Sequence, residues 1–297
     1  MKTIKAFIKN HPVPTYFALT FVISWGLVLL FIGGPGGIPG TPEQTKKLLP
    51  IVVLVMLVGP SLSGILLTGL VHGRAGFREF LSRLIRWRVG VRWYAVAILT
   101  TPVLATAALL ALLPTSPVFI PGIIASGNKA SLLLSGIMAG LAAGIFEELG
   151  WTGFAVPRLR LRHSVLATGL IVGFLWGAWH YLVAFWGGGN ASGKFDMPLL
   201  LAQMLFYVAV LPAYRVLMVW VYDRTQSLLV AMLMHACLTG FVLFILMPLE
   251  MSGAHLLTWY LVLAAALWVV VAAVAVASRG QLSRRPLPRQ DGLKSSL

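Results

Sequence analysis

The 297-residue chain has little negative charge: it contains eight aspartate and glutamate residues against 23 lysine and arginine residues. It also has a single cysteine, Cys237, which excludes an internal disulfide and any metal cluster built from several cysteines. A net charge of +15 would ordinarily suggest nucleic acid as a partner, but the basic residues are scattered through short loops between apolar runs. Membrane topology explains this scatter better, so we expect no nucleic-acid partner.

Apolar residues make up 59% of the sequence, and only 10% of the residues are charged. Several runs reach the roughly 18 uncharged residues that a helix needs to cross the hydrocarbon core of a bilayer. The sequence predicts an all-α protein, a polytopic membrane helix bundle with eight spans at residues 14–33, 50–71, 93–113, 131–156, 165–186, 198–222, 227–247 and 256–278. Residues 1–278 then form a single transmembrane domain, and residues 279–297 a basic cytoplasmic tail that we expect to be disordered.

The basic residues are unequally divided between the two sides of these spans. With alternate segments assigned to alternate sides, one side holds 19 lysine and arginine residues and the other holds four. The side with the excess is normally cytoplasmic, so we expect both termini in the cytoplasm and the bundle in the cell membrane. Residues 72–92 are basic and amphipathic, and we expect them to lie on the cytoplasmic membrane surface.

Ionisable side chains are rare inside the predicted spans. Glu147 and Glu148 are the only acids at depth, and His180 and His235 are the only histidines inside apolar runs. A charged side chain at the bilayer centre costs roughly 2.5 to 3.5 kcal/mol, so a retained pair indicates function. Neighbouring helical residues point about 100° apart, so the two glutamates should have different roles. The four groups predict one shared hydrolytic site, and the alternative is that each histidine only forms a hydrogen bond between helices.

The sequence does not contain the motifs of other classes of intramembrane protease. None of the six histidines begins a His-Glu-x-x-His motif, and no aspartate lies in a predicted span. Ser63 and Ser135 are each followed by glycine, but neither lies in a full Gly-x-Ser-Gly pattern. An aspartyl dyad is therefore excluded, and a serine nucleophile is disfavoured.

Three motifs resemble those of a known family, and they occur in the right order between residues 55 and 245. They are Glu147-Glu148 followed by Gly-Trp-x-Gly, an aromatic residue four positions before His180 (Trp176), and His235 followed four positions later by Thr239. This set resembles the CPBP family, the CAAX-prenyl-protease and bacteriocin-processing intramembrane proteases, which are also called the Abi family.

The chain departs from the family pattern at one charged position. The family places an arginine four residues after the second glutamate, where this sequence has Thr152. Arg215 is the only basic residue well inside a predicted span, and it has two interpretations: it could approach Glu148 in place of the missing arginine, or its side chain could extend to the cytoplasmic interface. The sequence favours the second, because Arg215 lies near the end of its span.

The resemblance implies hydrolysis of a peptide bond in a peptide or protein substrate within or at the membrane. Glu147 would be the general base on a water held with His180, while His235 and Thr239 would polarise the carbonyl or stabilise the oxyanion. Glu148, with its own face of the helix, would support this site. Zinc is the cofactor in question, because His180, His235 and Glu147 are a set of side chains that catalytic zinc sites use.

The sequence also agrees with non-enzymatic functions. A proton-coupled carrier, or an immunity protein that binds a toxic peptide, could use Glu147 and His180 as a proton relay. Carriers usually contain internal repeats, and we find none between the two halves of the sequence. A relative without activity that only holds a partner is another reading, because of Thr152.

Overall fold

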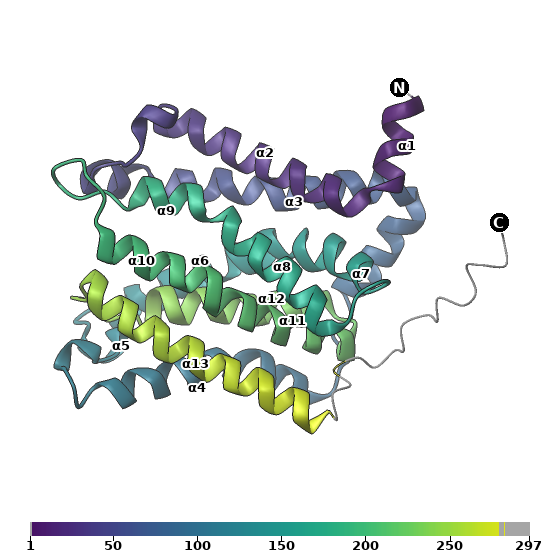
Figure 1. Ribbon diagram of the computed structural model, residues 1–297. Helices are drawn as coiled ribbons and strands as arrows, with labels where there is room; N and C mark the ends of the chain where they lie inside the picture. Colours follow the sequence, from purple (N-terminus) through teal and green to yellow (C-terminus); the bar gives the residue numbers. More distant parts are fainter. Residues whose placement is uncertain (1, 279–281, 283–297) are drawn as a thin grey trace.

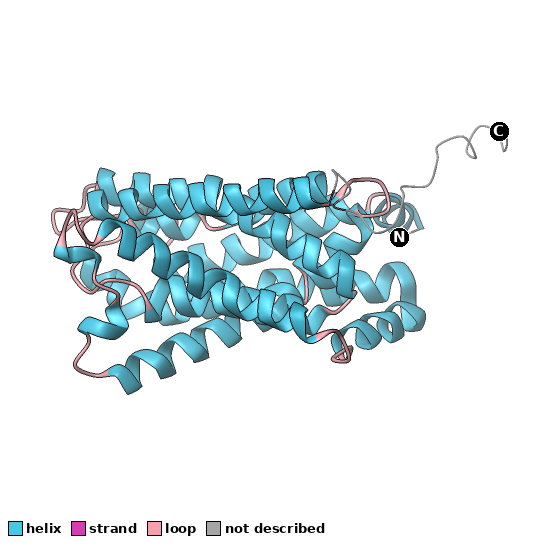
Figure 2. Ribbon diagram, turned by 90° about the horizontal axis from the view of Figure 1, so that it is seen from below, coloured by secondary structure: helices cyan, strands magenta, loops and turns pink. Residues whose placement is uncertain are grey.

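The structure is a computed structural model that describes residues 2–278 and 282. Eight helices within this part are long and apolar enough to cross a membrane, which confirms the predicted helix bundle and its eight spans. Figure 2 shows the helices running along the molecule with most of the loops gathered at its two ends. The predicted tail, 279–297, lies outside the described residues except for Leu282.

The first half of the chain supplies two outer layers of the bundle. Figure 1 shows α2 and α3 along one edge and α4 along the other. The helices of this half are α1 (Lys2–Asn10), α2 (Pro12–Ile32), α3 (Pro42–Leu84), α4 (Val91–Leu112), the short α5 (Gly122–Ala125) and α6 (Lys129–Glu148).

The second half supplies most of the interior, and α13 lies beside α4 at the edge (Figure 1). Its segments are η3 (Trp151–Ala155), α7 (Val156–Leu159), α8 (Val165–Trp179), α9 (Tyr181–Gly187), α10 (Met197–Leu205), η4 (Phe206–Val210), α11 (Leu211–Thr225), α12 (Leu228–Cys237), η5 (Leu238–Ile245) and α13 (Gly253–Ala277). The segments η3, η4 and η5 are π-helical turns.

Helix α3 extends further at its C-terminal end than the sequence predicts. The sequence predicts a span that stops at residue 71 and a separate surface helix over 72–92, but α3 continues to Leu84 across a kink at Gly73, where φ is 58°. Beyond the kink, Arg83 is buried and donates hydrogen bonds to the Tyr222 hydroxyl and the Gly153 carbonyl. The segment is therefore partly packed into the bundle, because Phe80 and Arg83 find buried partners there.

Four of the predicted spans are interrupted along their length. The spans that contain the glutamate pair, Pro212 and His235 each include a π-helical turn, and the fifth span divides at His180. The π-helical turn η4 ends two residues before Pro212. Such turns are rare in helices and occur frequently at functional sites.

Two close helix contacts place the interrupted segments together. A Cβ added to Gly144 on α6 would lie 2.5 Å from the Met232 carbonyl oxygen on α12, and one added to Gly173 on α8 would lie 2.6 Å from Pro212 Cα on α11. Small residues allow such an approach between membrane helices. As a result α6 packs on α12, and α8 packs on α11.

Candidate active site

Glu147 and Glu148 are the last two residues of α6, directly before the chain enters the π-helical turn η3. Both side chains are buried, with 4% and 0% of their surface exposed. Glu148 continues the glycine-lined face of α6 that packs on α12, so its carboxylate points toward His235. Glu147 points toward α8, as the helical offset between neighbours requires.

The carboxylate of Glu148 is fully occupied by three side chains. Arg215 Nη1 lies 2.9 Å from both Oε1 and Oε2, and His235 Nδ1 lies 2.6 Å from Oε1. Thr152 Oγ1 donates a further hydrogen bond to Oε2. Glu148 is therefore an electrostatic anchor that holds charged partners in place, since it has no free oxygen to act on a substrate.

Arg215 is 0% exposed, so the prediction that its side chain reaches the membrane interface is wrong, and the alternative, that it approaches Glu148, is confirmed. Its guanidinium carbon also lies 4.1 Å from the centre of the Trp176 ring. Thr152 supplies a hydrogen bond from the position of the family arginine, and Arg215 supplies the positive charge from α11.

The carboxylate of Glu147 has a different environment from that of Glu148. Its Oε2 accepts hydrogen bonds from the indole Nε1 of Trp176 at 2.7 Å and of Trp151 at 3.1 Å. Its Oε1 lies 3.7 Å from His235 Nε2. One oxygen is therefore fixed by two neutral donors, while the other faces an imidazole across a short gap.

His235 on α12 joins the two carboxylates. Its Nδ1 contacts Glu148, its Nε2 faces Glu147, and its ring centre lies 4.9 Å from that of Trp176. A carboxylate oxygen accepts, so the contact at Nδ1 is a hydrogen bond that His235 donates. Glu148 thereby sets the orientation of the ring that faces Glu147.

His180 lies at the junction of α8 and α9, one turn beyond Trp176. Its Nδ1 lies 2.8 Å from the Trp176 carbonyl oxygen and must donate, because a carbonyl can only accept. Its ring stacks on Tyr207 of η4, with centres 4.9 Å apart and planes 13° apart. His180 is thus fixed beside the group that holds Glu147, and its Nε2 stays available.

This part of the chain matches a protein-family model. The model describes a type II CAAX prenyl endopeptidase, Rce1-like, and it matches residues 129–241, a range that includes both glutamates, both histidines and Thr239. A curated relative, CAAX prenyl protease 2 of Methanococcus maripaludis, is 22% identical over 222 residues, which are 74% of this chain and 80% of the relative. Both comparisons are similar in kind to the CAAX-protease family that the sequence motifs resemble.

The structure brings most of the predicted site residues into direct contact, but not all of them. Glu147, Glu148, Thr152, Trp176, Arg215 and His235 are joined by direct contacts, and His180 is linked to them through Trp176. Thr239 lies on η5, one turn after His235, and its hydroxyl makes no hydrogen bond to any described residue. Its role at the oxyanion stays a prediction.

Trp151 is the contact that sequence reasoning did not assign to the site. It lies four residues after Glu147, which is the spacing of neighbours on one helix face, so the signal was present. Its ring is held by Tyr16, Phe17 and Trp179, with centres 5.6, 5.9 and 5.8 Å away. Helix α2, outside the matched range, therefore helps to fix the indole that binds Glu147.

The side chains proposed for zinc do not fit a metal as they stand. The described residues contain no group of three or more His, Cys, Asp or Glu side chains arranged to hold an ion. Only Glu147 Oε1 and His235 Nε2 approach each other, and Nδ1 of His180 is directed at a backbone carbonyl. Zinc at His180, His235 and Glu147 stays a prediction.

Proposed function

We propose that this chain is an intramembrane endopeptidase in which Glu147 activates the water that cleaves a peptide bond. The observation that carries the proposal is the 3.7 Å approach of Glu147 Oε1 to His235 Nε2, inside a cluster whose other atoms are already engaged. General bases need a fixed carboxylate with one accessible oxygen, and Glu147 has this arrangement.

The charges of the cluster support a protonated His235. Two buried carboxylates face one buried guanidinium, so one further positive charge makes the cluster neutral. A neutral cluster is favoured where charges are shielded from water. With both ring nitrogens protonated, His235 donates to Glu148 through Nδ1 and presents Nε2–H toward the gap at Glu147.

The hydrolysis then follows from these positions. Nε2–H of His235 polarises the substrate carbonyl, together with the hydroxyl of Thr239, and stabilises the oxyanion. Water held between Glu147 and His180 attacks the carbonyl carbon, and its proton passes to Glu147. Glu147 returns this proton to the leaving amine nitrogen as the carbon–nitrogen bond breaks, so the carboxylate is regenerated.

The membrane placement supports a membrane-bound peptide as substrate. The basic end of the bundle is proposed to face the cytoplasm of the cell, with both termini there. The relative's name and the family point to two substrate classes: a prenylated carboxy-terminal CAAX peptide, or a bacteriocin-like precursor. Because Glu147 and His235 are 4% and 1% exposed, the helices around them must separate for a peptide to enter.

Cleavage of a prenylated CAAX-type peptide by the purified chain in liposomes tests the proposal. Glu147→Gln keeps the shape but removes proton acceptance, so we expect normal folding and at least a ~10²-fold loss of rate. Glu250→Gln is a matched control, because Glu250 is exposed in a loop. Retained activity in Glu147→Gln would refute the assignment. A chelator arm tests zinc: loss that zinc restores would favour a metal site, and resistance would favour glutamate alone.

A further inference from the structure

A cavity at the basic end of the bundle lies away from the catalytic cluster. It has a volume of about 430 Å³ and lies where three separate parts of the chain meet: the junction of α1 and α2, the kink of α3, and the loop between α7 and α8. Figure 1 shows α1, α7 and the bent end of α3 together at this end. The lining of the cavity includes six basic side chains: Lys9, His11, His72, Arg158, Arg162 and His163.

The cavity gathers positive charge without matching negative charge. None of the described residues that line it is acidic. Glu79, which lies beyond the kink of α3, contacts Arg83 instead, with its Oε1 3.7 Å from Arg83 Nε. Like charges that face one cavity repel one another, so a bound anion would stabilise their arrangement. The lining therefore favours an anionic ligand.

Arg158 is held in place by the π-helical turn η3. Its guanidinium carbon lies 3.5 Å from the centre of the Phe154 ring, and its Nη1 donates to the Phe154 carbonyl oxygen at 2.7 Å. Its Nε is buried and has no hydrogen-bond partner among the described residues. The protein thus orients the guanidinium and leaves N–H groups for a ligand. A planar guanidinium held in this way matches the oxygens of a phosphate.

The surroundings of the cavity indicate a lipid as the source of such a phosphate. The cavity lies close to the start of α2, the start of α8 and the end of the apolar run in α3, which is where a span meets the headgroup region. Apolar side chains are exposed around it: Leu161 in the lining is 67% exposed, and Phe7 on α1 is 60% exposed. A lipid could therefore place its phosphate among the basic side chains and its acyl chains on these apolar side chains.

We propose that this cavity binds the phosphate of an anionic glycerophospholipid. The phosphate would accept hydrogen bonds from Arg158 and Arg162 on one side and from Lys9 of α1 on the other, and it would thereby join α1 to the end of α7. A zwitterionic lipid such as phosphatidylcholine is a poorer ligand, because its choline cation would lie among the same basic side chains. The proposal concerns binding and is independent of peptide cleavage.

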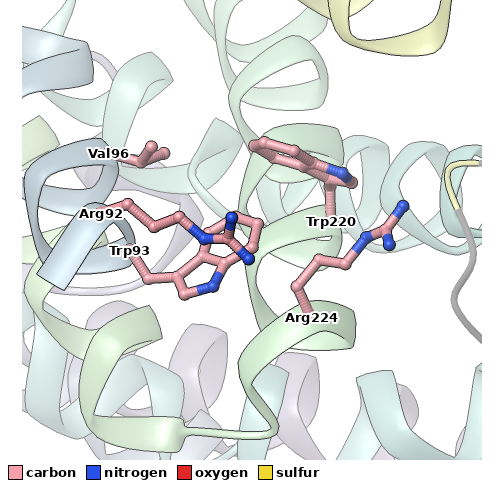
Figure 3. A pocket seen from close by; sticks show the side chains of 5 residues that line it. All are labelled: Arg92, Trp93, Val96, Trp220 and Arg224. Carbon is pink, nitrogen blue, oxygen red and sulfur yellow. The ribbon is translucent and has the colours of Figure 1, made fainter. Parts of the chain in front are cut away.

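A second cavity at the same end has a different lining. It has a volume of about 440 Å³ and lies between the first turns of α4 and the last turns of α11, and Figure 3 shows the side chains that line it. Only two of them are basic, Arg92 and Arg224, and Arg224 already takes part in an interaction within the chain. We therefore assign the phosphate to the first cavity, and Arg92 in the second serves as a control position.

The test is a lipid titration of the full-length protein, purified in a neutral detergent and followed by native mass spectrometry and thermal unfolding. Phosphatidylglycerol and phosphatidylcholine with identical acyl chains are compared. We expect phosphatidylglycerol to bind more tightly and to raise the unfolding temperature. The double variant Lys9→Gln/Arg162→Gln should fold normally, because both side chains are exposed, and should weaken phosphatidylglycerol binding at least about tenfold.

Arg158→Lys separates a phosphate site of defined geometry from general attraction by charge. Lysine keeps the positive charge but removes the planar guanidinium, so we expect phosphatidylglycerol binding to weaken about fivefold. Unfolding without lipid shows whether this variant folds, and if it does not, Lys9→Gln/Arg162→Gln alone decides the proposal. Unchanged binding in folded Arg158→Lys would overturn the proposal, because it would show attraction by charge alone.

The matched control removes two arginines at the same end but outside the cavity. Arg88 and Arg92 are both exposed, and their guanidinium carbons lie 5.0 and 5.2 Å from the centres of tryptophan rings. Arg88→Gln/Arg92→Gln should change phosphatidylglycerol binding less than about twofold. Equal weakening in both double variants would overturn the proposal, because it would show a diffuse charge effect. Equal binding of phosphatidylcholine would also overturn it. Displacement of the lipid by an equal concentration of soluble glycerol phosphate would show a free-phosphate site and would overturn the assignment to lipid.

Discussion

Arg215 Nη1 lies 2.9 Å from both carboxylate oxygens of Glu148, although the two residues are 67 positions apart in the chain. Both side chains are 0% exposed. An isolated charge at this depth would be unstable, so each residue is tolerated because the other is present. The pair also orients His235, which faces Glu147.

The first prediction concerns the removal of this charge. Arg215→Gln removes the guanidinium from the buried carboxylate of Glu148, and breaking a buried pair in this way costs about 3–5 kcal/mol. We expect a clearly lower unfolding temperature in detergent and loss of peptide cleavage. Placing an arginine at the family position, in Thr152→Arg/Arg215→Gln, should restore part of both, because Thr152 already contacts Glu148. An Arg215→Gln variant as stable as wild type would contradict the role of the pair.

The position of Arg215 also shows what the sequence could not predict. Its place near the end of a span indicates a side chain that reaches water, but the direction of a helical side chain depends on rotation about the axis. The π-helical turn η4 changes this rotation just before Arg215, and the sequence carries no clear signal for it. The close packing of Gly173 against Pro212 then directs the side chain of Arg215 toward the carboxylate of Glu148.

Other parts of the site could be predicted from the sequence, because they depend on composition alone. Only two acids and two histidines lie in the apolar runs, and a membrane tolerates such groups where they meet each other. The contact between Glu147 and His235 follows from this scarcity. The continuation of α3 to Leu84 could not be predicted, because it depends on hydrogen bonds between Arg83 and residues far away in the sequence.

The second prediction tests the indole donors of Glu147. Trp176→Phe keeps an aromatic ring beside Arg215 and His235 but removes the 2.7 Å hydrogen bond to Oε2. A hydrogen bond to a charged group contributes about 1.5–3 kcal/mol, so we expect the cleavage rate to fall about 10- to 100-fold. The measurement is kcat and KM on one peptide, with the loss expected in kcat. Trp87→Phe, at an exposed position, is the control, and an unchanged kcat in Trp176→Phe would contradict the prediction.

The third prediction concerns the helix contact that aligns Glu148 with His235. Gly144→Ala would place a Cβ 2.5 Å from the Met232 carbonyl oxygen, so α6 and α12 must separate. We expect a destabilisation of about 1–3 kcal/mol, seen as a lower unfolding temperature, with reduced cleavage. Gly26→Ala on α2 is the matched control, since its added Cβ meets nothing within 4 Å and should be neutral or slightly stabilising. Equal behaviour of the two variants would contradict this packing.

The fourth prediction separates the two nitrogens of His235. Asparagine places its amide near the position of Nδ1, so His235→Asn can keep the hydrogen bond to Glu148 while losing the group that faces Glu147. Glutamine places its amide near Nε2, so His235→Gln loses the contact with Glu148 instead. We expect both variants to lose cleavage by at least ~10²-fold, because neither amide carries the positive charge that the imidazolium supplies.

His235→Asn and His235→Gln should differ in thermal stability, although both lose cleavage activity. His235→Asn should unfold close to the wild-type temperature, because Glu148 keeps its donors. His235→Gln should unfold earlier, because one carboxylate oxygen of Glu148 loses a buried charged partner, a loss of about 1–3 kcal/mol. Thermal unfolding and peptide cleavage measured on the same samples decide the matter. If His235→Asn were the less stable of the two, His235 would not be oriented by Glu148, and the charge arrangement proposed for catalysis would fail with it.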